Sequence, residues 1–383
     1  MSAAEARITS RSGHPELVSL GQLSARIGRD PLLVQASSGN TSIKADRILW
    51  VKASGKWLAD AEQYQIFVPV DLAEVRECLR QNTDFAGIDS SSSQTRMSAS
   101  IETFMHAAFP HRVVIHVHSV NTIAWAVRQD AQVRLAEQLA GLPWQWIPYV
   151  PSGLPLGREI ANVVIGHPKT DILVLGNHGL VIGGEDCDTA ERLLIEIERR
   201  LAISPRVAPE ARSALLTRLA RISPWRLPDL RNLHALGTDP TSRRILKGGV
   251  LYPCQAIFLG RTAPLIPCSV PFSDVRNHIG EHDECRSLLI LEGSGVMVSE
   301  RITRAEQATL TGLMEVLQRI GPAAPIRYLR ESDVTGVLTG TLGHYRQAAE
   351  NSEPRSGFCA ITRRLRHRLQ ASPRRRPRTP IPK

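Results

Sequence analysis

Apolar residues at helical spacing open the patterned part of the chain. They repeat every three or four positions and stop at Gly28, and they are Leu17, Leu20, Leu23 and Ile27. This spacing predicts an amphipathic helix that ends at Gly28. Two short apolar runs follow at 42–44 and 48–53, and they predict a pair of strands around a turn at 45–46.

The spacing of the apolar residues changes from helical to strand-like over the next two predicted elements. Over residues 100–108 the apolar positions fall at i, i+3, i+4 and i+7. This predicts a helix with Ser100 as its N-cap, and Pro110 stops it. Residues 113–118 are then β-branched and apolar enough for a buried strand, apart from two histidines.

The pattern repeats further along the chain. Residues 172–175 and 180–182 predict two strands around an Asn-His-Gly turn at 177–179, and helical spacing returns over 190–201. Strands and helices therefore alternate, which predicts an α/β fold.

Proline-containing segments interrupt the pattern between about 203 and 230, and they predict a boundary there. Beyond it lie an apolar segment at 255–259, a strand at 288–291 and a helix that begins at the capping box Thr303–Glu306. We therefore expect a catalytic domain over 1–205, a C-terminal α/β extension over 206–353 and a disordered basic tail over 354–383.

The composition is that of a folded protein. The chain has 383 residues, of which 42% are hydrophobic and 22% charged, so it can bury one large core or two smaller ones. No apolar run is long enough for a membrane helix, and residues 1–7 carry no stretch typical of a secretory signal. The six cysteines form no CxxC pair; they are Cys78, Cys187, Cys254, Cys268, Cys285 and Cys359. We expect buried thiols in a soluble, cytoplasmic protein without a membrane span.

The net charge of +10 comes from one end of the chain. Residues 354–383 hold nine Arg and one Lys but no Asp or Glu, so the rest carries 37 basic and 37 acidic side chains. We therefore expect no nucleic-acid binding by the body. The tail is compatible with contacts to RNA or anionic lipid, or with plain solvation.

Two histidines stand two positions apart in the predicted strand 113–118. The imidazoles of His116 and His118 leave the same face of a strand, so both can reach one ion. The alternative is a pair of core histidines, which costs free energy unless each ring finds a partner. His178 lies in the tight turn at 177–179, and three neutral imidazoles with an open fourth position are typical of a catalytic zinc site.

Glu102 is the nearest candidate for proton transfer. It lies in the helix that directly precedes the histidine strand, fourteen residues before His116. A carboxylate there can work beside a metal, or it can simply compensate the helix dipole. Gln94 cannot take up a proton and is interpreted as the end of a capping box.

Several segments together resemble one protein family. They occur in the order seen in the class II aldolase/adducin family: QASSGNTSIK at 35–44, WVKASG at 50–55, SIET at 100–103, PHR at 110–112 before His116 and His118, PYV at 148–150, and NHGL at 177–180. The similarity spans about residues 15–205. More loosely, GVLYP at 249–253 and HYRQ at 344–347 resemble the aldolase part of bifunctional rhamnulose-phosphate aldolase/dehydrogenase proteins, without a dehydrogenase half.

The resemblance implies a three-layer α/β/α class II aldolase-like domain that assembles as a homotetramer. It implies one Zn²⁺ per subunit, held by His116, His118 and His178, with Glu102 as the acid/base. It also implies that Asn40, Ser54, Gly55 and Ser100 shape a pocket for a substrate phosphate, and that Tyr149 protonates the departing aldehyde. Lys44 is either an added charge for that phosphate or a solvated strand residue.

The expected activity is that of a zinc-dependent aldehyde-lyase. A cation chelated by a ketose stabilises the enediolate that forms when the C3–C4 bond of a small, phosphorylated sugar breaks. The same apparatus serves epimerisation or decarboxylation of a sugar-acid phosphate, and an adducin-like scaffold without activity is a further alternative. The sequence does not choose the sugar.

Three other patterns are discounted. The run at 278–282 matches the metalloprotease pattern H-x-x-E-H, but Gly280 weakens the helix that the pattern needs. Residues 54–57 lack the upstream Gly and the final Ser or Thr of a P-loop. His106 and His111 are interpreted as surface or helix-face polar groups.

Overall fold

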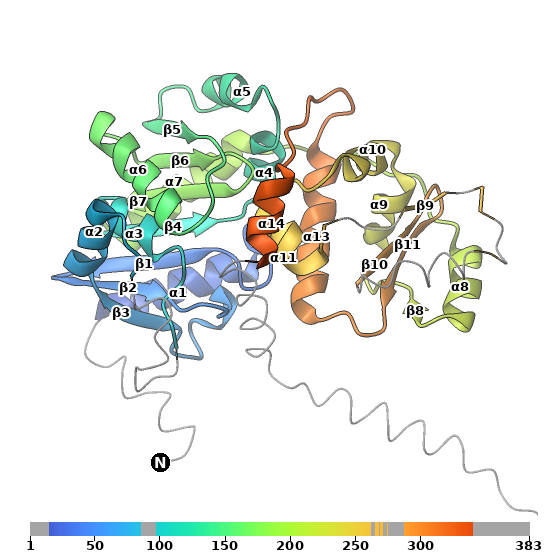
Figure 1. Cartoon of the computed structure of the whole chain (residues 1–383), viewed down its shortest axis with the longest axis horizontal. Coiled ribbons are helices and arrows are strands. Elements are labelled where there is room, and N and C mark those ends of the chain that lie inside the picture. Colours follow the sequence, from blue (N-terminus) through green and yellow to red (C-terminus); the bar gives the residue numbers. More distant parts are fainter. Residues whose placement is uncertain are drawn as a thin grey trace, which may run out of the picture.

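The computed structural model describes residues 15–85, 97–261, 265–267, 269–270, 274 and 287–339. Several features singled out above lie outside these residues: Gln94, Cys268, Cys285, Cys359, and the segments 278–282, 344–347 and 354–383. Within the described residues the chain builds two sheets with helices packed around them (Figure 1). None of the helices described combines the length and apolar character that crossing a membrane requires.

The larger sheet has seven strands in the order β3-β2-β1-β4-β7-β6-β5. The strands are β1 (Asn40–Ala45), β2 (Ile48–Lys52), β3 (Phe67–Asp71), β4 (Val113–Val117), β5 (Trp144–Ile147), β6 (Ile172–Leu175) and β7 (Gly179–Gly184). Every neighbouring pair is antiparallel except β5 and β6. The strands expected at 42–44, 48–53, 113–118, 172–175 and 180–182 are all present in this sheet.

Helices cover both faces of this sheet, which confirms the three-layer α/β/α prediction. The helices of this part are α1 (Pro15–Arg29), α2 (Leu72–Gln81), α3 (Thr103–Ala108), α4 (Val120–Ala126), α5 (Ala131–Gln138), α6 (Leu154–Gly166) and α7 (Cys187–Leu201), with a short 3₁₀ helix, η2 (Leu58–Asp60). Helices α1, α5 and α7 share one apolar cluster with one face of the sheet. Helices α2, α3 and α6 pack on the other face.

Side chains along β4 point alternately to the two faces of the sheet, and this determines on which face His116 lies. Val113, Ile115 and Val117 enter the cluster with α1 and α7, whereas Val114 packs with α3 and α6. His116 follows Val114 by two positions and therefore leaves the sheet on the α3 side. The register pairs Asn40 of β1 directly with His116, so both side chains emerge together.

The second sheet has four strands in the order β8-β11-β10-β9. Its strands are β8 (Trp225–Arg226), β9 (Leu265–Ile266), β10 (Leu288–Leu291) and β11 (Gly295–Ser299). The helices of this part are α8 (Ser213–Ile222), η4 (Arg231–His234), α9 (Ala235–Thr238), α10 (Pro240–Gly248), α11 (Pro253–Leu259), α13 (Arg304–Arg319) and α14 (Glu331–Thr339). Figure 1 shows α11, α13 and α14 between the two sheets. The domain limits 1–205 and 206–353 stay a prediction.

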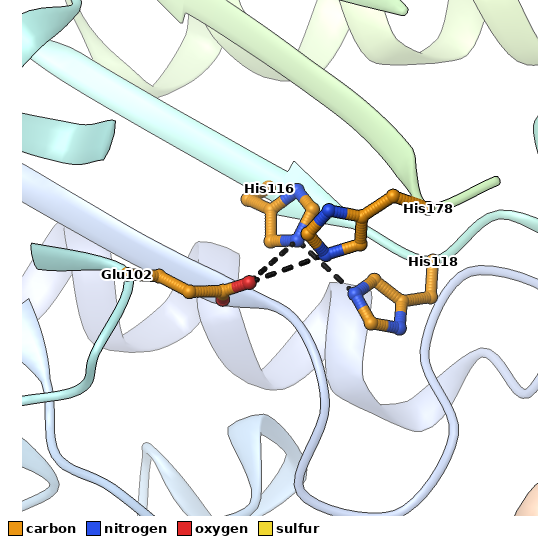
Figure 2. A group of neighbouring side chains, drawn as sticks. All are labelled: Glu102, His116, His118 and His178. Carbon is orange, nitrogen blue, oxygen red and sulfur yellow. Dashed lines mark hydrogen bonds and ion pairs between the residues drawn. The ribbon is translucent and has the colours of Figure 1, made fainter. Parts of the chain in front are cut away.

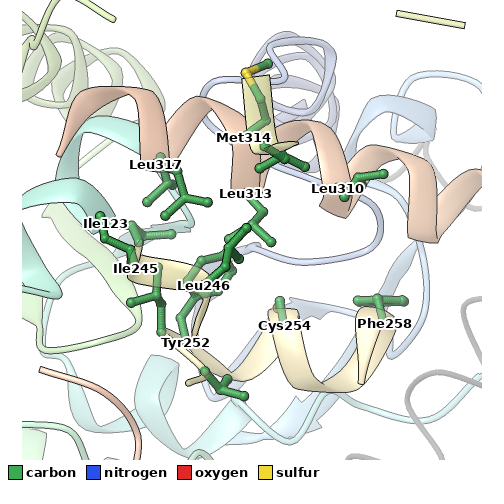
Figure 3. Close-up of a cluster of buried hydrophobic side chains, with 14 of the residues drawn as sticks. Ile123, Ile245, Leu246, Tyr252, Cys254, Phe258, Leu310, Leu313, Met314 and Leu317 are labelled. Atoms are coloured by element: carbon green, nitrogen blue, oxygen red, sulfur yellow. The ribbon is translucent and has the colours of Figure 1, made fainter. Parts of the chain in front are cut away.

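One large apolar cluster joins the two parts. It contains Val120 and Ile123 of α4 together with side chains of α11 and α13, as Figure 3 shows for Ile123, Tyr252 and Leu313 among others. Both parts therefore bury apolar surface against each other.

Two helix starts test the capping predictions. The capping box at Thr303 and Glu306 is present with both of its hydrogen bonds. The prediction that Ser100 caps the helix after it is wrong, since α3 begins at Thr103 and its N-cap residue is Glu102. The Ser100 hydroxyl instead accepts hydrogen bonds from the backbone N–H of Glu102 and from Asn40 Nδ2. The Ser100 hydroxyl thus makes one local and one tertiary contact just before the helix.

The contact between α3 and α6 depends on Gly157. A Cβ at this position would lie 2.6 Å from Phe104 Cβ and 2.9 Å from Leu79 Cδ2. We expect Gly157→Ala to lower the free energy of unfolding by about 1–3 kcal/mol through overpacking, as urea denaturation measures it. Gly166→Ala is the matched control, because Gly166 ends the same helix and a Cβ there meets nothing within 4 Å. Equal stability of the two variants would contradict this packing argument.

Candidate metal centre

Three imidazole rings converge at the end of the large sheet (Figure 2). His116 lies on β4, and His118 follows the end of that strand, directly before the helix α4. The third ring, of His178, lies in the turn between β6 and β7. The ring centroids are 4.9, 4.9 and 5.1 Å apart, and each pair of rings is tilted by 73–79°. The three rings thus surround one common point nearly symmetrically.

The turn that carries His178 has a special backbone. Asn177 adopts a left-handed conformation with φ of 53°, which Asn tolerates better than most residues. Its side-chain Nδ2 donates to the carbonyls of Leu251 and Arg327, at 2.8 Å each. Asn177 therefore fixes both the shape of the turn and its place against the C-terminal extension.

Hydrogen bonds on the outer side of the rings decide which nitrogen faces the centre. His116 Nδ1 lies 3.0 Å from the carbonyl oxygen of Leu180. Because a carbonyl only accepts, Nδ1 carries the proton and Nε2 keeps its lone pair. His118 Nδ1 lies 3.4 Å from Cys254 Sγ, and its Nε2 lies 3.1 Å from Nε2 of His116.

Glu102 completes the cluster. Its Oε1 lies 3.3 Å from Nε2 of His116 and 3.3 Å from Nε2 of His178. The four ligand atoms all lie within 4.8 Å of one another. Tetrahedral zinc with bonds of about 2.0–2.1 Å keeps its ligands roughly 3.3 Å apart, so these separations fit such an ion. Three imidazoles and one carboxylate are also a donor set that zinc binds.

Burial shifts the pKa values of the side chains that could bind a cation. Burial in the protein lowers the pKa of His118 well below the usual histidine range, and it also lowers the pKa of His178. Both rings are therefore neutral at pH 7, which is the form that binds metals. Burial alone raises the pKa of Glu102, but His116 and His178 lower it more, by attraction and hydrogen bonds whenever a ring carries a proton towards the carboxylate, so this pKa lies well below its usual value. The carboxylate is thus ionised.

Asn40 and Ser100 hold the carboxylate from the other side. Asn40 Nδ2 donates to Glu102 Oε2 and, at 3.4 Å, to the Ser100 hydroxyl. All three side chains are buried. The structure therefore brings Asn40, Ser100 and Glu102 together with the three histidines.

A small cavity of about 30 Å³ opens beside the cluster. Ser100, Glu102, His118 and His178 line it, all of them expected from the sequence. Ser38, Gly39, Ile101 and Ser152 line it too, although no sequence pattern pointed to a role for them. Its remaining wall is the helix α11, through Pro253, Cys254 and Ile257.

Three expected site residues belong neither to the cluster around the rings nor to the lining of this cavity. Ser54 donates its backbone N–H to the Ser98 carbonyl, and Gly55 has φ of +70° in the turn after β2. Tyr149 is partly buried against the cluster formed with the extension, and burial raises its pKa to about 12. Their roles in a reaction stay predictions.

Among the described residues two lysines are buried: Lys44, which differs from both expectations, and Lys52, which the sequence analysis did not single out. Lys44 is neither solvated nor near the rings, since its Nζ donates to the carbonyls of Phe109 and His111 at the other end of β1. Lys52 is completely buried, and its Nζ donates to the carbonyls of Ser37 and Lys56. It thereby joins the turn before Asn40 to the turn that contains Ser54 and Gly55. Burial lowers the pKa of Lys52 to about 7, against the attraction of Glu102.

His106 is buried as well, so its interpretation as a surface or helix-face polar group is wrong. Its ring is fully inaccessible on α3, and Nδ1 lies 2.7 Å from the Ser42 hydroxyl. Burial lowers the pKa of His106 to about 3. His111 lies nearer the surface, where its Nε2 pairs with Asp171 at 2.8 Å.

Comparison with known proteins finds a family match for the part of the chain that carries this centre. Residues 20–204 match the family model of the Class II Aldolase and Adducin N-terminal domain. This confirms the resemblance that the sequence motifs indicated. A curated relative, the uncharacterized oxidoreductase YuxG of Bacillus subtilis (strain 168), is 30% identical over 186 residues. The match covers 45% of this chain but only 27% of YuxG, so the chain spans about a quarter of that relative's length.

Two solved structures are similar to about half of this chain. The N-terminal class II aldolase domain of a conserved protein from Thermoplasma acidophilum is 25% identical, with a TM-score of 0.43, over 51% of this chain and 96% of that one. The L-fuculose-1-phosphate aldolase from Thermus thermophilus is 17% identical, with a TM-score of 0.35, over 49% of this chain and 92% of that one.

The cluster predicts how metal affinity responds to loss of one ring. Structural zinc sites bind with about 10–16 kcal/mol shared among four ligands, so each ligand contributes roughly 3 kcal/mol, or about 100-fold. We expect His178→Ala to weaken zinc binding by about this factor in a chelator competition titration. The control is His167→Ala, which removes an exposed histidine away from the cluster. Unchanged zinc affinity in His178→Ala would show that this ring is not a ligand.

The buried ring of His106 makes stability depend on pH. The unfolded chain takes up a proton below pH 6.5, whereas the folded protein resists it down to pH 3. Stability is therefore unaffected above 6.5 and falls steadily as the pH drops towards 3, by about 2 kcal/mol at pH 5. We expect His106→Asn to lose this part of the pH dependence in urea denaturation at pH 7 and pH 5. Parallel behaviour of both proteins would contradict a buried neutral ring.

Proposed function

We propose, from the membership of residues 20–204 in the class II aldolase and adducin family, that this protein is a zinc-dependent aldehyde-lyase. Its substrate would be a small, phosphorylated ketose that undergoes retro-aldol cleavage. The observation that carries the proposal is the convergence of three Nε2 atoms and one ionised carboxylate beside a cavity.

Zinc suits the donor set, and His116, His118 and His178 would hold it. A divalent cation bound there supplies Lewis-acid stabilisation for the negative charge that develops on the substrate oxygens. The hydrogen bond to Leu180 keeps the ring of His116 in the required tautomer. The protein thus fixes its ligands before any ion or substrate binds.

Glu102 would move the proton. In the cleavage direction the C4 hydroxyl loses a proton as the C3–C4 bond breaks, and C3 keeps the electron pair and gains a proton. The carboxylate lies beside the ligands, so once it has taken up the proton that the C4 hydroxyl loses it can deliver it to C3, and in the condensation direction it removes that proton again. Asn40 holds Oε2, which leaves Oε1 turned towards the rings.

The phosphate would bind at the two turns that Lys52 joins. The hydroxyls of Ser54 and Ser100, the backbone N–H of Gly55 and the side chain of Asn40 offer donors there. Lys52 lies buried beneath both turns, and because its pKa is about 7 it is protonated in part at neutral pH; a bound anion would favour its protonated form. Tyr149 is proposed as the acid that protonates the aldehyde oxygen in the condensation direction, since a pKa of about 12 keeps its hydroxyl protonated at pH 7. A cytoplasmic homotetramer is part of the same proposal.

The ligand set argues against an inactive scaffold. A scaffold needs no buried carboxylate among three imidazoles, because gathering such groups costs free energy without a cation. Epimerisation and decarboxylation use the same apparatus, so they are outcomes that the experiment must separate.

The test combines metal analysis of the purified protein with exchange of solvent deuterium into dihydroxyacetone phosphate. We expect about one zinc per subunit and exchange at carbon, with cleavage of one or more ketose phosphates. Glu102→Gln should slow the exchange by about 10²–10⁴-fold, the usual contribution of general acid–base catalysis. Exchange that survives in this variant would exclude Glu102 as the base. Zinc without exchange would favour an oxo-acid or a substrate without phosphate.

A further inference from the structure

The helix α11 from the C-terminal extension forms one wall of the cavity beside the rings. Pro253, Cys254 and Ile257 line this wall, and Figure 3 shows Cys254 and Phe258 on the helix below α13. The cavity measures about 30 Å³, whereas ligand pockets usually measure roughly 300–1,000 Å³. The helix α11 therefore narrows the space beside the rings.

Cys254 contacts a metal-site histidine directly. Its Sγ lies 3.4 Å from His118 Nδ1, the ring nitrogen turned away from the other two imidazoles, and both side chains are buried. If the sulfur accepts the Nδ1–H proton, Nε2 of His118 keeps its lone pair for a cation. Cys254 then does for His118 what the Leu180 carbonyl does for His116.

A second contact from the extension reaches the same loop indirectly, through Gln35 of the first part of the chain. Gln35 Nε2 donates to the carbonyl of His118 at 3.3 Å. The Gln35 side chain packs on Gly312 of α13, where a Cβ would come within 2.4 Å of Gln35 Cγ. The loop that carries His118 is therefore held at its carbonyl through α13 and at its ring through α11.

We infer that Cys254 is a positioning residue that orients the ring of His118 for metal binding, as part of a wall that α11 provides within the same chain. The inference rests on the proposed function, because it concerns the same metal site. Outer partners of metal-bound histidines fix the ring orientation and the tautomer, and their loss typically weakens metal binding by about 10–100-fold.

The test separates this role from simple packing. The full-length wild type, Cys254→Ala, Cys254→Ser and Ile257→Ala are compared for zinc affinity by chelator competition, and for the visible absorption of bound Co²⁺. Ile257 is the matched control, since it lines the same wall one turn further along α11. Thermal unfolding of the metal-free proteins checks that each variant folds.

We expect Cys254→Ala to bind zinc about 10–100-fold more weakly and to change the Co²⁺ spectrum, with Ile257→Ala within about twofold of wild type. Cys254→Ser should recover part of the affinity, because its hydroxyl can accept from Nδ1–H. If Cys254→Ala does not fold, an altered Co²⁺ spectrum of Cys254→Ser supports the inference, and an unaltered one overturns it.

Two further results would overturn it. One is a zinc affinity of Cys254→Ala within about twofold of wild type, and the other is an equal loss in Ile257→Ala. If the wild type itself binds no metal, the proposed function fails and this inference fails with it. If all four proteins bind metal equally well, the inference about Cys254 is wrong, but the proposed function is not affected.

Discussion

A carboxylate and three imidazoles that lie within 4.8 Å of one another have lost most of their water, and this loss must be compensated. The protein compensates it by giving these groups fixed partners on their outer sides. The carbonyl of Leu180 binds His116, Cys254 contacts His118, and Asn40 donates to Glu102. The pairing of β1 with β4 places Asn40 directly opposite His116 and therefore beside the cluster. In the part of the chain that the structure describes, the nitrogen and oxygen atoms that face the centre have no such outer partner, and together they attract a cation.

The site residues and helices that could be predicted from the sequence are those with a recognisable local spacing. Two histidines at a spacing of two in an apolar strand, and a third in a tight turn, are visible without any tertiary information. The helix at 190–201 was equally visible, since its apolar face keeps a period of 3.6 residues. The cap predicted at Ser100 is wrong because α3 begins only at Thr103, while the Ser100 hydroxyl also binds Asn40, sixty residues away, which no local pattern shows. The contact of Cys254 with His118 could not be predicted from the sequence, because the two residues are 136 positions apart and only the fold brings them together.

The boundary in the chain does not separate two independent cores. Trp57, Val120 and Ile123 from the first part share an apolar cluster with α11 and α13. The guanidinium group of Arg304 also lies 4.1 Å from the ring centre of Trp57, a cation–π contact across the same junction. The extension is thus attached through buried surface rather than through a linker, and movement of α11 must disturb part of this core.

The position of α11 in the sequence determines the order in which the parts of the centre are synthesised. During synthesis all three rings and Glu102 leave the ribosome before Cys254, which follows His118 by 136 residues. The contacts that α11 and α13 make with the His118 loop can therefore form only after both helices have been synthesised.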